Sequence, residues 1–250
     1  MKEKRSNKGV GVEEHIYRAP ELHVIAISCA AAAALFLIRT LLVFVLGGTF
    51  YTETGDNGIT YRYFGLMDGE RPTLGVFRGT DSSGGTVSGD TVKYKDGSVY
   101  KGKLYYLSPE GKGILTTKNG DEYSGTFVDG KLSGEGRVVF ADGSKFYGSF
   151  KDGLFDGYGE IICTDGTGYK GYFLEGEKSG YGEYLYHDGS VYKGQFEHDM
   201  REGSGEYRFA SGDRYQGEFK NNVINGYGIY FFYSGRTYSG QFVFGVPQVD

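Results

Sequence analysis

One spacing dominates this sequence. An aromatic residue recurs at intervals of 23 residues, a glycine follows it two residues later, and in most cases a phenylalanine follows two residues after that. The aromatic positions are Tyr100, Tyr123, Phe146, Tyr169, Tyr192, Tyr215 and Tyr238. A period of this length and regularity marks a repeat architecture, in which each unit is one supersecondary element that stacks on its neighbours.

Each unit alternates with the period of a β-strand. Tyr123, Gly125 and Phe127 fall on one strand face, where the glycine leaves room for neighbouring rings to lie over its backbone. A G-x-G pair, Gly134 and Gly136 in this unit, then leads into a second alternating strand. The residues that define the repeat are Tyr100, Gly102, Tyr123, Gly125, Phe127, Gly134, Gly136, Gly148, Phe150, Tyr169, Gly171, Phe173, Tyr192, Gly194, Phe196, Tyr215, Gly217, Phe219, Tyr238, Gly240 and Phe242.

A turn signal closes each unit. Asp142-Gly143 and its equivalents tolerate positive φ, which predicts a type I′ turn into the next strand. The 44 glycines, 23 tyrosines and 4 prolines of the chain suit short strands and tight turns. The predicted fold is therefore an all-β repeat array, in which consecutive 23-residue β-hairpins pair edge to edge into an elongated single-layer antiparallel sheet.

The array is predicted to begin with a degenerate unit. Over residues 77–99, Phe77 and Gly79 keep the register, but Asp81 replaces the phenylalanine and Ser88 and Asp90 replace the glycine pair. End units of repeat arrays are expected to be atypical because they cap the stack. Residues 100–250 then provide six full units and a terminal half.

The template Y-x-G-x-F, then G-x-G, then D-G resembles the MORN repeat (membrane occupation and recognition nexus) over residues 77–250. Phe146 in place of Tyr and Leu104 in place of Phe are mild departures. The resemblance implies a MORN-like solenoid and a largely non-enzymatic organiser, sometimes dimeric, at membranes and cytoskeletal edges.

A membrane anchor is predicted ahead of the array. Residues 22–48 are apolar over about the 20 residues that a helix needs to cross a bilayer, between a polar segment at 1–21 and a linker at 49–76. A cleaved signal peptide is the alternative, although the polar segment is long for one. Arg39 within the span either snorkels to the interface or pairs with another membrane helix. Basic residues precede the span and the first basic residue after it is Arg62, so the N-terminus is expected in the cytoplasm and the repeats on the outer side.

Residue patterns for catalysis are weak. The four histidines are scattered, with His187 just before a turn and His198 in a hairpin loop. Cys29 and Cys163 form neither a metal spacing nor a disulfide framework. We therefore expect no enzymatic activity, no metal and no cofactor. Basic residues form no block that would indicate nucleic-acid binding.

A binding surface is predicted on the second strands. Their ring-lined face becomes more aromatic toward the C-terminus, and tyrosine-rich surfaces supply contact area at a small entropic cost. The candidate partner-binding residues are Tyr184, Tyr186, Tyr207, Phe209, Tyr230 and Phe232. The alternative is that these rings form only the core.

Three functions are open at this point. The first is a membrane-anchored scaffold that binds a protein partner. The second is a tether whose repeats bind phospholipid, which the charge disfavours because residues 95–250 carry 17 basic and 22 acidic residues and anionic lipid attracts basic clusters. The third is a non-catalytic subunit of an enzyme complex. A homodimer formed through the sheet edge at Tyr238–Val243 is a further possibility.

Overall fold

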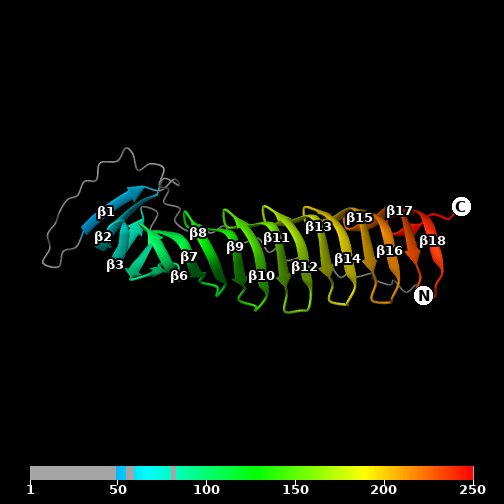
Figure 1. Ribbon diagram of the computed structural model, residues 1–250, viewed down its shortest axis with the longest axis horizontal. Helices are drawn as coiled ribbons and strands as arrows, with labels where there is room; N and C mark the ends of the chain where they lie inside the picture. The colour runs from blue at the N-terminus through cyan, green and yellow to red at the C-terminus, as the bar shows by residue number, and fades with distance from the viewer. Residues whose placement is uncertain (1–48, 55–58, 80–82, 250) are drawn as a thin grey trace, which may run out of the picture.

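The computed structural model describes residues 49–54, 59–79 and 83–249, which form one antiparallel sheet of 19 strands. Each strand pairs with the next along the chain, so the sheet is an elongated meander (Figure 1). The strands are β1 (Thr49–Thr54), β2 (Thr60–Asp68), β3 (Arg71–Gly79), β4 (Gly84–Ser88), β5 (Thr91–Tyr94), β6 (Val99–Tyr105), β7 (Ser108–Thr116), β8 (Glu122–Val128), β9 (Lys131–Val139), β10 (Lys145–Lys151), β11 (Leu154–Ile162), β12 (Gly168–Leu174), β13 (Glu177–Leu185), β14 (Val191–Glu197), β15 (Met200–Arg208), β16 (Arg214–Lys220), β17 (Val223–Phe231), β18 (Thr237–Val243) and β19 (Val246–Pro247).

The predicted membrane-spanning helix at 22–48 and the polar segment at 1–21 lie outside the described residues. In the part of the chain that is described, no helix is long and apolar enough to cross a membrane.

The predicted hairpin unit is confirmed. From β6 to β17 every unit is a seven-residue strand paired with a nine-residue strand, and its second strand pairs with the first strand of the next unit. Consecutive units are therefore joined by the same backbone ladder that joins the two strands within a unit.

The type I′ turn lies within the unit rather than at its end. Asp129 and Gly130 join β8 to β9 with φ angles of 48° and 79°, and two consecutive residues with positive φ define this turn. The equivalent pairs are Asp152-Gly153, Glu175-Gly176, His198-Asp199, Asn221-Asn222 and Phe244-Gly245.

The predicted type I′ turn at Asp142-Gly143 is wrong. Gly143 is the one residue between Phe140 and Ser144 with positive φ, at 92°, and its N–H donates to the carbonyl of Phe140 at 2.9 Å. This is a four-residue turn that ends in a left-handed glycine. Asp142 acts through its side chain instead, because Oδ1 accepts the N–H of Ser144 at 2.8 Å.

Except in the unit of Tyr123, where Leu132 and Phe150 lie against the two glycines instead, the repeat aromatic ring lies over two glycines, as the alternation predicts. A Cβ built on Gly194 would come within 2.3 Å of the Tyr192 hydroxyl, and one built on Gly205 of the next strand within 2.5 Å of the same ring. The hydroxyl of Tyr192 donates to the carbonyl of Gln195 at 2.9 Å. The ring is thus fully buried while its polar end stays hydrogen-bonded.

Each hairpin folds back on itself at its glycines. In β10–β11, Phe146 lies near one end of the pairing and Phe155 at the other, with a register shift after Gly148. The two rings nevertheless stack with centroids 3.8 Å apart and an interplanar angle of 12°. One bent sheet therefore buries its own rings, and full burial of each contributes roughly 2–3 kcal/mol.

The tight turns also connect neighbouring units. The N–H of Gly153 donates to the carbonyl of Leu132 in the preceding unit at 2.9 Å, and Gly176 donates to Phe155 at 2.8 Å. The same bond recurs from Asp199 to Lys178 and from Asn222 to Arg201, each at 3.1 Å. The hairpin tips are thereby bonded along the array as well as through the ladder.

The segment at 49–76, predicted as a linker, instead contains β1, β2 and most of β3. Tyr63 behaves as a repeat tyrosine: its hydroxyl donates to the carbonyl of Leu66 at 2.8 Å, and its ring lies where a Cβ on Gly65 or Gly75 would be. This hairpin escaped the sequence analysis because Tyr63 does not fall on the 23-residue register that Phe77 continues.

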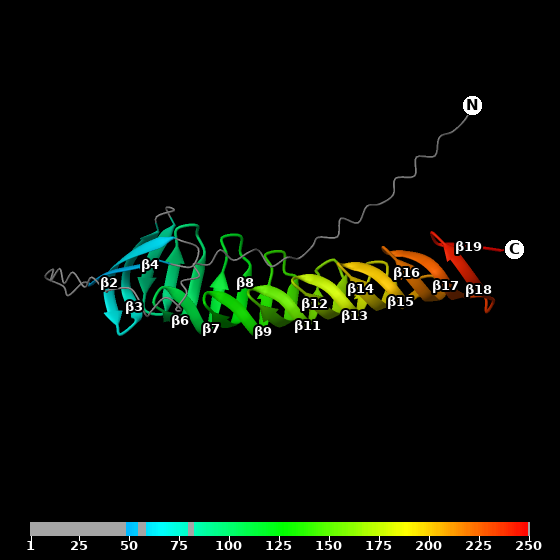
Figure 2. The same cartoon turned by 90° about the horizontal axis from the view of Figure 1, so that it is seen from above.

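The predicted capping unit at 77–99 also begins in the wrong place. Phe77 lies near the end of β3, and the next hairpin is the short pair β4–β5. The first strands meet the array again at the turns, where the N–H of Tyr106 donates to the carbonyl of Glu70 at 2.8 Å and Tyr51 stacks on Tyr106. Figure 2 shows these blue and cyan strands turned relative to the rest of the array.

The close approach of ring and glycine predicts a position-specific loss of stability. Gly205→Ala places a methyl group against Tyr192 without any positive-φ strain, so we expect a loss of about 1–3 kcal/mol from overpacking. Ser204→Ala, at the adjacent exposed position, is the matched control and should change stability by less than about 0.5 kcal/mol. Urea unfolding followed by far-UV circular dichroism measures both, and equal midpoints would contradict the packing described.

Candidate partner-binding surface

The six predicted aromatic residues form one continuous row. They lie at the C-terminal ends of β13, β15 and β17 and in the turns that follow. Consecutive centroids are 4.5 Å apart for Tyr184–Tyr186, 5.5 Å for Tyr186–Tyr207, 4.6 Å for Tyr207–Phe209, 5.6 Å for Phe209–Tyr230 and 4.7 Å for Tyr230–Phe232. We call these residues the aromatic row.

The aromatic row is both core and surface. Its first five members are half-buried against the core, and Phe232 is 40% exposed. In earlier units the residues equivalent to Tyr184, Val138 and Ile161, are buried, whereas those equivalent to Tyr186, Phe140 and Cys163, are half-buried. The two interpretations left open by the sequence therefore describe the same rings, whose inner faces pack while their outer edges meet solvent.

Two cations lie beneath the row. The second position of the long strands holds Pro109, Leu132, Phe155, Lys178, Arg201 and Ile224 in successive units. Because the hairpin folds back, this position faces the repeat aromatic residue; Lys178 thus takes the place that Phe155 has over Phe146. Its Nζ lies 5.2 Å from the ring centre of Tyr184 and 5.9 Å from that of Tyr169.

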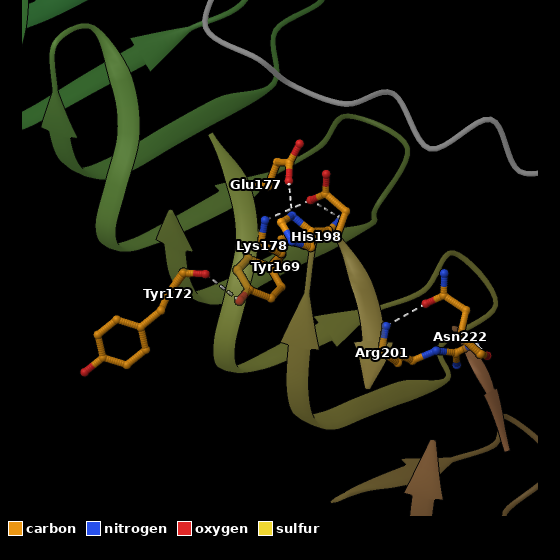
Figure 3. A network of polar contacts seen from close by, with 8 residues as sticks. Tyr169, Tyr172, Glu177, Lys178, His198, Arg201 and Asn222 are labelled. Carbon is orange, nitrogen blue, oxygen red and sulfur yellow. Dashed lines mark hydrogen bonds and ion pairs between the residues drawn. The ribbon is translucent and has the colours of Figure 1, made fainter. Parts of the chain in front are cut away.

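Lys178 is held by the turn of the next unit (Figure 3). Asp199 Oδ1 accepts the N–H of Lys178 at 2.8 Å and lies 3.6 Å from its Nζ, with both side chains 15% exposed. His198, beside it in the turn, contacts Glu177 through Nδ1 at 2.8 Å, and this hydrogen bond raises the pKa of His198. In this unit a carboxylate thus stands where the earlier turns have Gly153 and Gly176.

Arg201 has the same relation to the following turn. Asn222 Oδ1 accepts the N–H of Arg201 at 2.7 Å, and its carbonyl accepts from the guanidinium (Figure 3). The guanidinium carbon lies 5.3 Å from the ring centre of Tyr207 and 5.7 Å from that of Tyr186. Arg201 Nε is buried without a hydrogen-bond partner among the described residues. Burial leaves this donor unsatisfied, a cost that the cation–π contacts partly offset.

The far end of the row is fixed by a carboxylate. The hydroxyl of Tyr230 donates to Asp213 Oδ2 at 3.0 Å, and the N–H of Tyr233 donates to Oδ1 at 2.7 Å. The Tyr233 N–H is the main reason that the pKa of Asp213 is lowered. Burial, followed by the bond to Asp213, raises the pKa of Tyr230 to about 12, so this phenol stays a neutral donor at physiological pH.

The sequence analysis missed Lys178 and Arg201 because it considered only the C-terminal half of each second strand, where the aromatic row lies. The signal was present in the repeat itself, since one core position changes from Leu132 and Phe155 to two cations. Within the described residues, no group of three or more His, Cys, Asp or Glu side chains could hold a metal ion.

The edge proposed for dimerisation is partly covered. β19 pairs with β18 at Phe242 and Val243, and the N–H of Gln248 donates to the carbonyl of Gln241 at 2.9 Å. The hydroxyl of Tyr238 donates to the carbonyl of Gln248 at 2.6 Å. Less of the Tyr238–Val243 edge is thus open to a second chain than the sequence suggested.

Five consecutive MORN repeats are detected in the chain. The family model of the MORN repeat matches residues 123–145, 146–168, 169–191, 192–214 and 215–235. These segments contain the hairpins from β8–β9 to β16–β17. The hairpin β6–β7 and strand β18 lie outside them but have the same glycine pairing, Gly102 with Gly113 and Gly228 with Gly240.

Other comparisons show only distant similarity. Among curated proteins, no match to the sequence is found. One similar solved structure is the TCP domain of Drosophila melanogaster SAS-4 in complex with a proline-rich motif of Ana2, at 16% identity, covering 70% of this chain and 96% of that chain, with a TM-score of 0.38. Another is the TCP10 domain of Danio rerio CPAP, at 14% identity, covering 80% and 99%, with a TM-score of 0.35. Similarity this low carries no functional conclusion.

The half-buried Arg201 beneath the row predicts an unusual pattern of stability. Arg201→Leu restores the residue type of Leu132, so we expect the free energy of unfolding to change by less than about 1 kcal/mol or to rise. Arg201→Ala removes the packed stem as well and should cost about 1–3 kcal/mol. Chemical denaturation distinguishes the two, with Leu132→Ala as the control for an ordinary core truncation. An equal loss in both Arg201 variants would mean that the charge itself stabilises the fold.

Proposed function

We propose that this protein is a non-enzymatic scaffold that is anchored in a membrane by residues 22–48 and binds a protein partner on its MORN-repeat array. The N-terminus would lie in the cytoplasm and the repeats on the outer side. The observation that carries the proposal is the aromatic row, six adjoining rings at one register of the array whose outer edges meet solvent.

The row has the chemistry of a recognition surface. Its rings are held in place from below by packing and by Lys178 and Arg201, so little side-chain entropy is lost when a partner binds. Phe232 at the open end provides the most exposed ring of the row. An elongated rigid array also fixes the distance between such a surface and whatever holds its first strands, which suits a scaffold.

The row is expected to form protein contacts in the cell that the opposite sheet face does not form. A photocrosslinking phenylalanine analogue at Phe232 should give a discrete covalent adduct with a protein. The same analogue at Tyr227, which is 65% exposed on the other face of the same hairpin, is the matched control. Truncation of two other row residues, Tyr207→Ala with Phe209→Ala, should abolish the Phe232 adduct while the circular dichroism spectrum is retained. Equal adducts at both positions would refute binding through the row.

The anchor is tested separately. We expect the full chain to stay with the membrane fraction after an alkaline carbonate wash, and a variant lacking residues 22–48 to be released. Protease added outside intact cells should remove the repeats if they lie on the outer side. A full chain that is released by carbonate would disprove the anchor but would leave the aromatic row in place.

A further inference from the structure

A second surface lies at the other end of the sheet, outside the matched repeats. It is a groove of about 750 Å³ on the outer face of β2–β5. Four of its lining residues are cations: Arg62, Arg78, Lys93 and Lys95. None of the described residues that line it is an aspartate or a glutamate. A groove of this size can hold a small ligand.

The cations lie close together because of the strand register. Arg62 is directly opposite Arg78 across β2–β3, and Arg78 is opposite Gly84 in β4. The carbonyl of Gly84 accepts the N–H of Lys95 at 2.7 Å. The row across the sheet thus runs from two arginines over a glycine without a side chain to a lysine, and the glycine leaves the space between them open.

Opposed arginines are unfavourable in a sheet unless something compensates them. Like charges directly opposite each other on neighbouring strands destabilise the pairing. No ion pair between described residues involves Arg62, Arg78 or Lys93. All three side chains are exposed, so each can meet a ligand from solvent.

Over β11–β15 the sheet alternates its charges. On the outer face of β11–β15 the directly opposed residues are Glu160 and Lys170, then Glu183 and Lys193, and Lys193 also lies opposite Glu206. Lys193 Nζ is 2.9 Å from Glu183 Oε2. Arg208 also lies opposite Arg214, but both contact Glu206, at 2.6 and 2.9 Å, whereas no described carboxylate lines the groove beside Arg62 and Arg78.

We infer that the groove is a binding site for a ligand that carries phosphate groups. Two guanidinium forks match the oxygens of a phosphate, and lysine ammonium groups add compact charge beside them. Arg62, Arg78 and Lys93 lie on three different strands, which favours a ligand with several phosphates, such as a polyphosphate or a phospholipid headgroup beside its neighbours. The site is separate from the aromatic row and does not depend on the function proposed for that row.

Lysine labelling of the full chain tests this inference. The protein is held in detergent micelles, and the acetylation rates of Lys93 and Lys145 are followed by mass spectrometry with and without inorganic tripolyphosphate. Lys145, exposed on β10, is the internal control. We expect tripolyphosphate to slow acetylation of Lys93 several-fold and to leave Lys145 unchanged.

A second arm separates the two sources of phosphate. The full chain is placed in nanodiscs of phosphatidylcholine alone or mixed with phosphatidylglycerol. Protection of Lys93 by phosphatidylglycerol, with no effect of tripolyphosphate, identifies the ligand as a lipid headgroup; the reverse identifies a soluble phosphate. Either outcome supports the site, whereas no protection in both arms, or equal protection of Lys145, overturns it.

Variants distinguish binding from a structural role. In Arg62→Gln with Arg78→Gln, the protection of Lys93 should be lost while the melting temperature is unchanged or higher, because the opposed charges are gone. A fall in melting temperature with protection retained would assign the arginines to the fold and overturn the inference. Lys145→Gln, the control variant, should alter neither quantity.

Discussion

The fold depends on one contact, an aromatic ring that lies across two glycines. No other residue fits beneath the ring, since a Cβ on either glycine would come within 2.6 Å of ring atoms in the unit of Tyr192. The same glycines mark where each strand shifts register and bends. Ring burial and strand bending are therefore coupled. A sheet that would otherwise expose one apolar face closes over its own side chains.

This closure explains the character of the aromatic row. Where the folded-back position is Leu132 or Phe155, the hairpin is sealed by apolar contact. Where it is Lys178 or Arg201, a long amphipathic side chain replaces the apolar one and its charge is met by rings and by the next turn. The interiors of the units with Lys178 and Arg201 thus contain charged groups as well as rings. Their second-strand rings lie nearer the surface than the equivalent valine and isoleucine.

The features of the fold that depend only on the spacing of residues were predicted from the sequence. Tyr123, Gly125 and Phe127 share a face, and their period sets both the pairing of strands and the membership of the aromatic row. What spacing could not predict was backbone conformation and departures from the register. Asp129-Gly130 and Asp142-Gly143 are identical dipeptides, yet the first forms the whole two-residue connection between β8 and β9 as a type I′ turn, whereas the second lies in the longer connection between β9 and β10. Tyr63 plays the role of a repeat tyrosine off the register, and the opposition of Arg62 and Arg78 depends on a pairing that no periodicity revealed.

The bonds between successive hairpin tips give the array a direction. Each tip donates an N–H to a backbone carbonyl of the unit before it, and the equivalent carbonyl of its own unit accepts the N–H of the next tip. Such a stack is modular in whole units only. Loss or duplication of 23 residues joins equivalent positions and preserves the ladder, ring and turn of each unit, whereas insertion of one residue within a strand moves the side chains beyond it in that strand to the other face. The reach of this protein can therefore change in steps, one hairpin at a time, while the surface chemistry of each unit stays independent of its length.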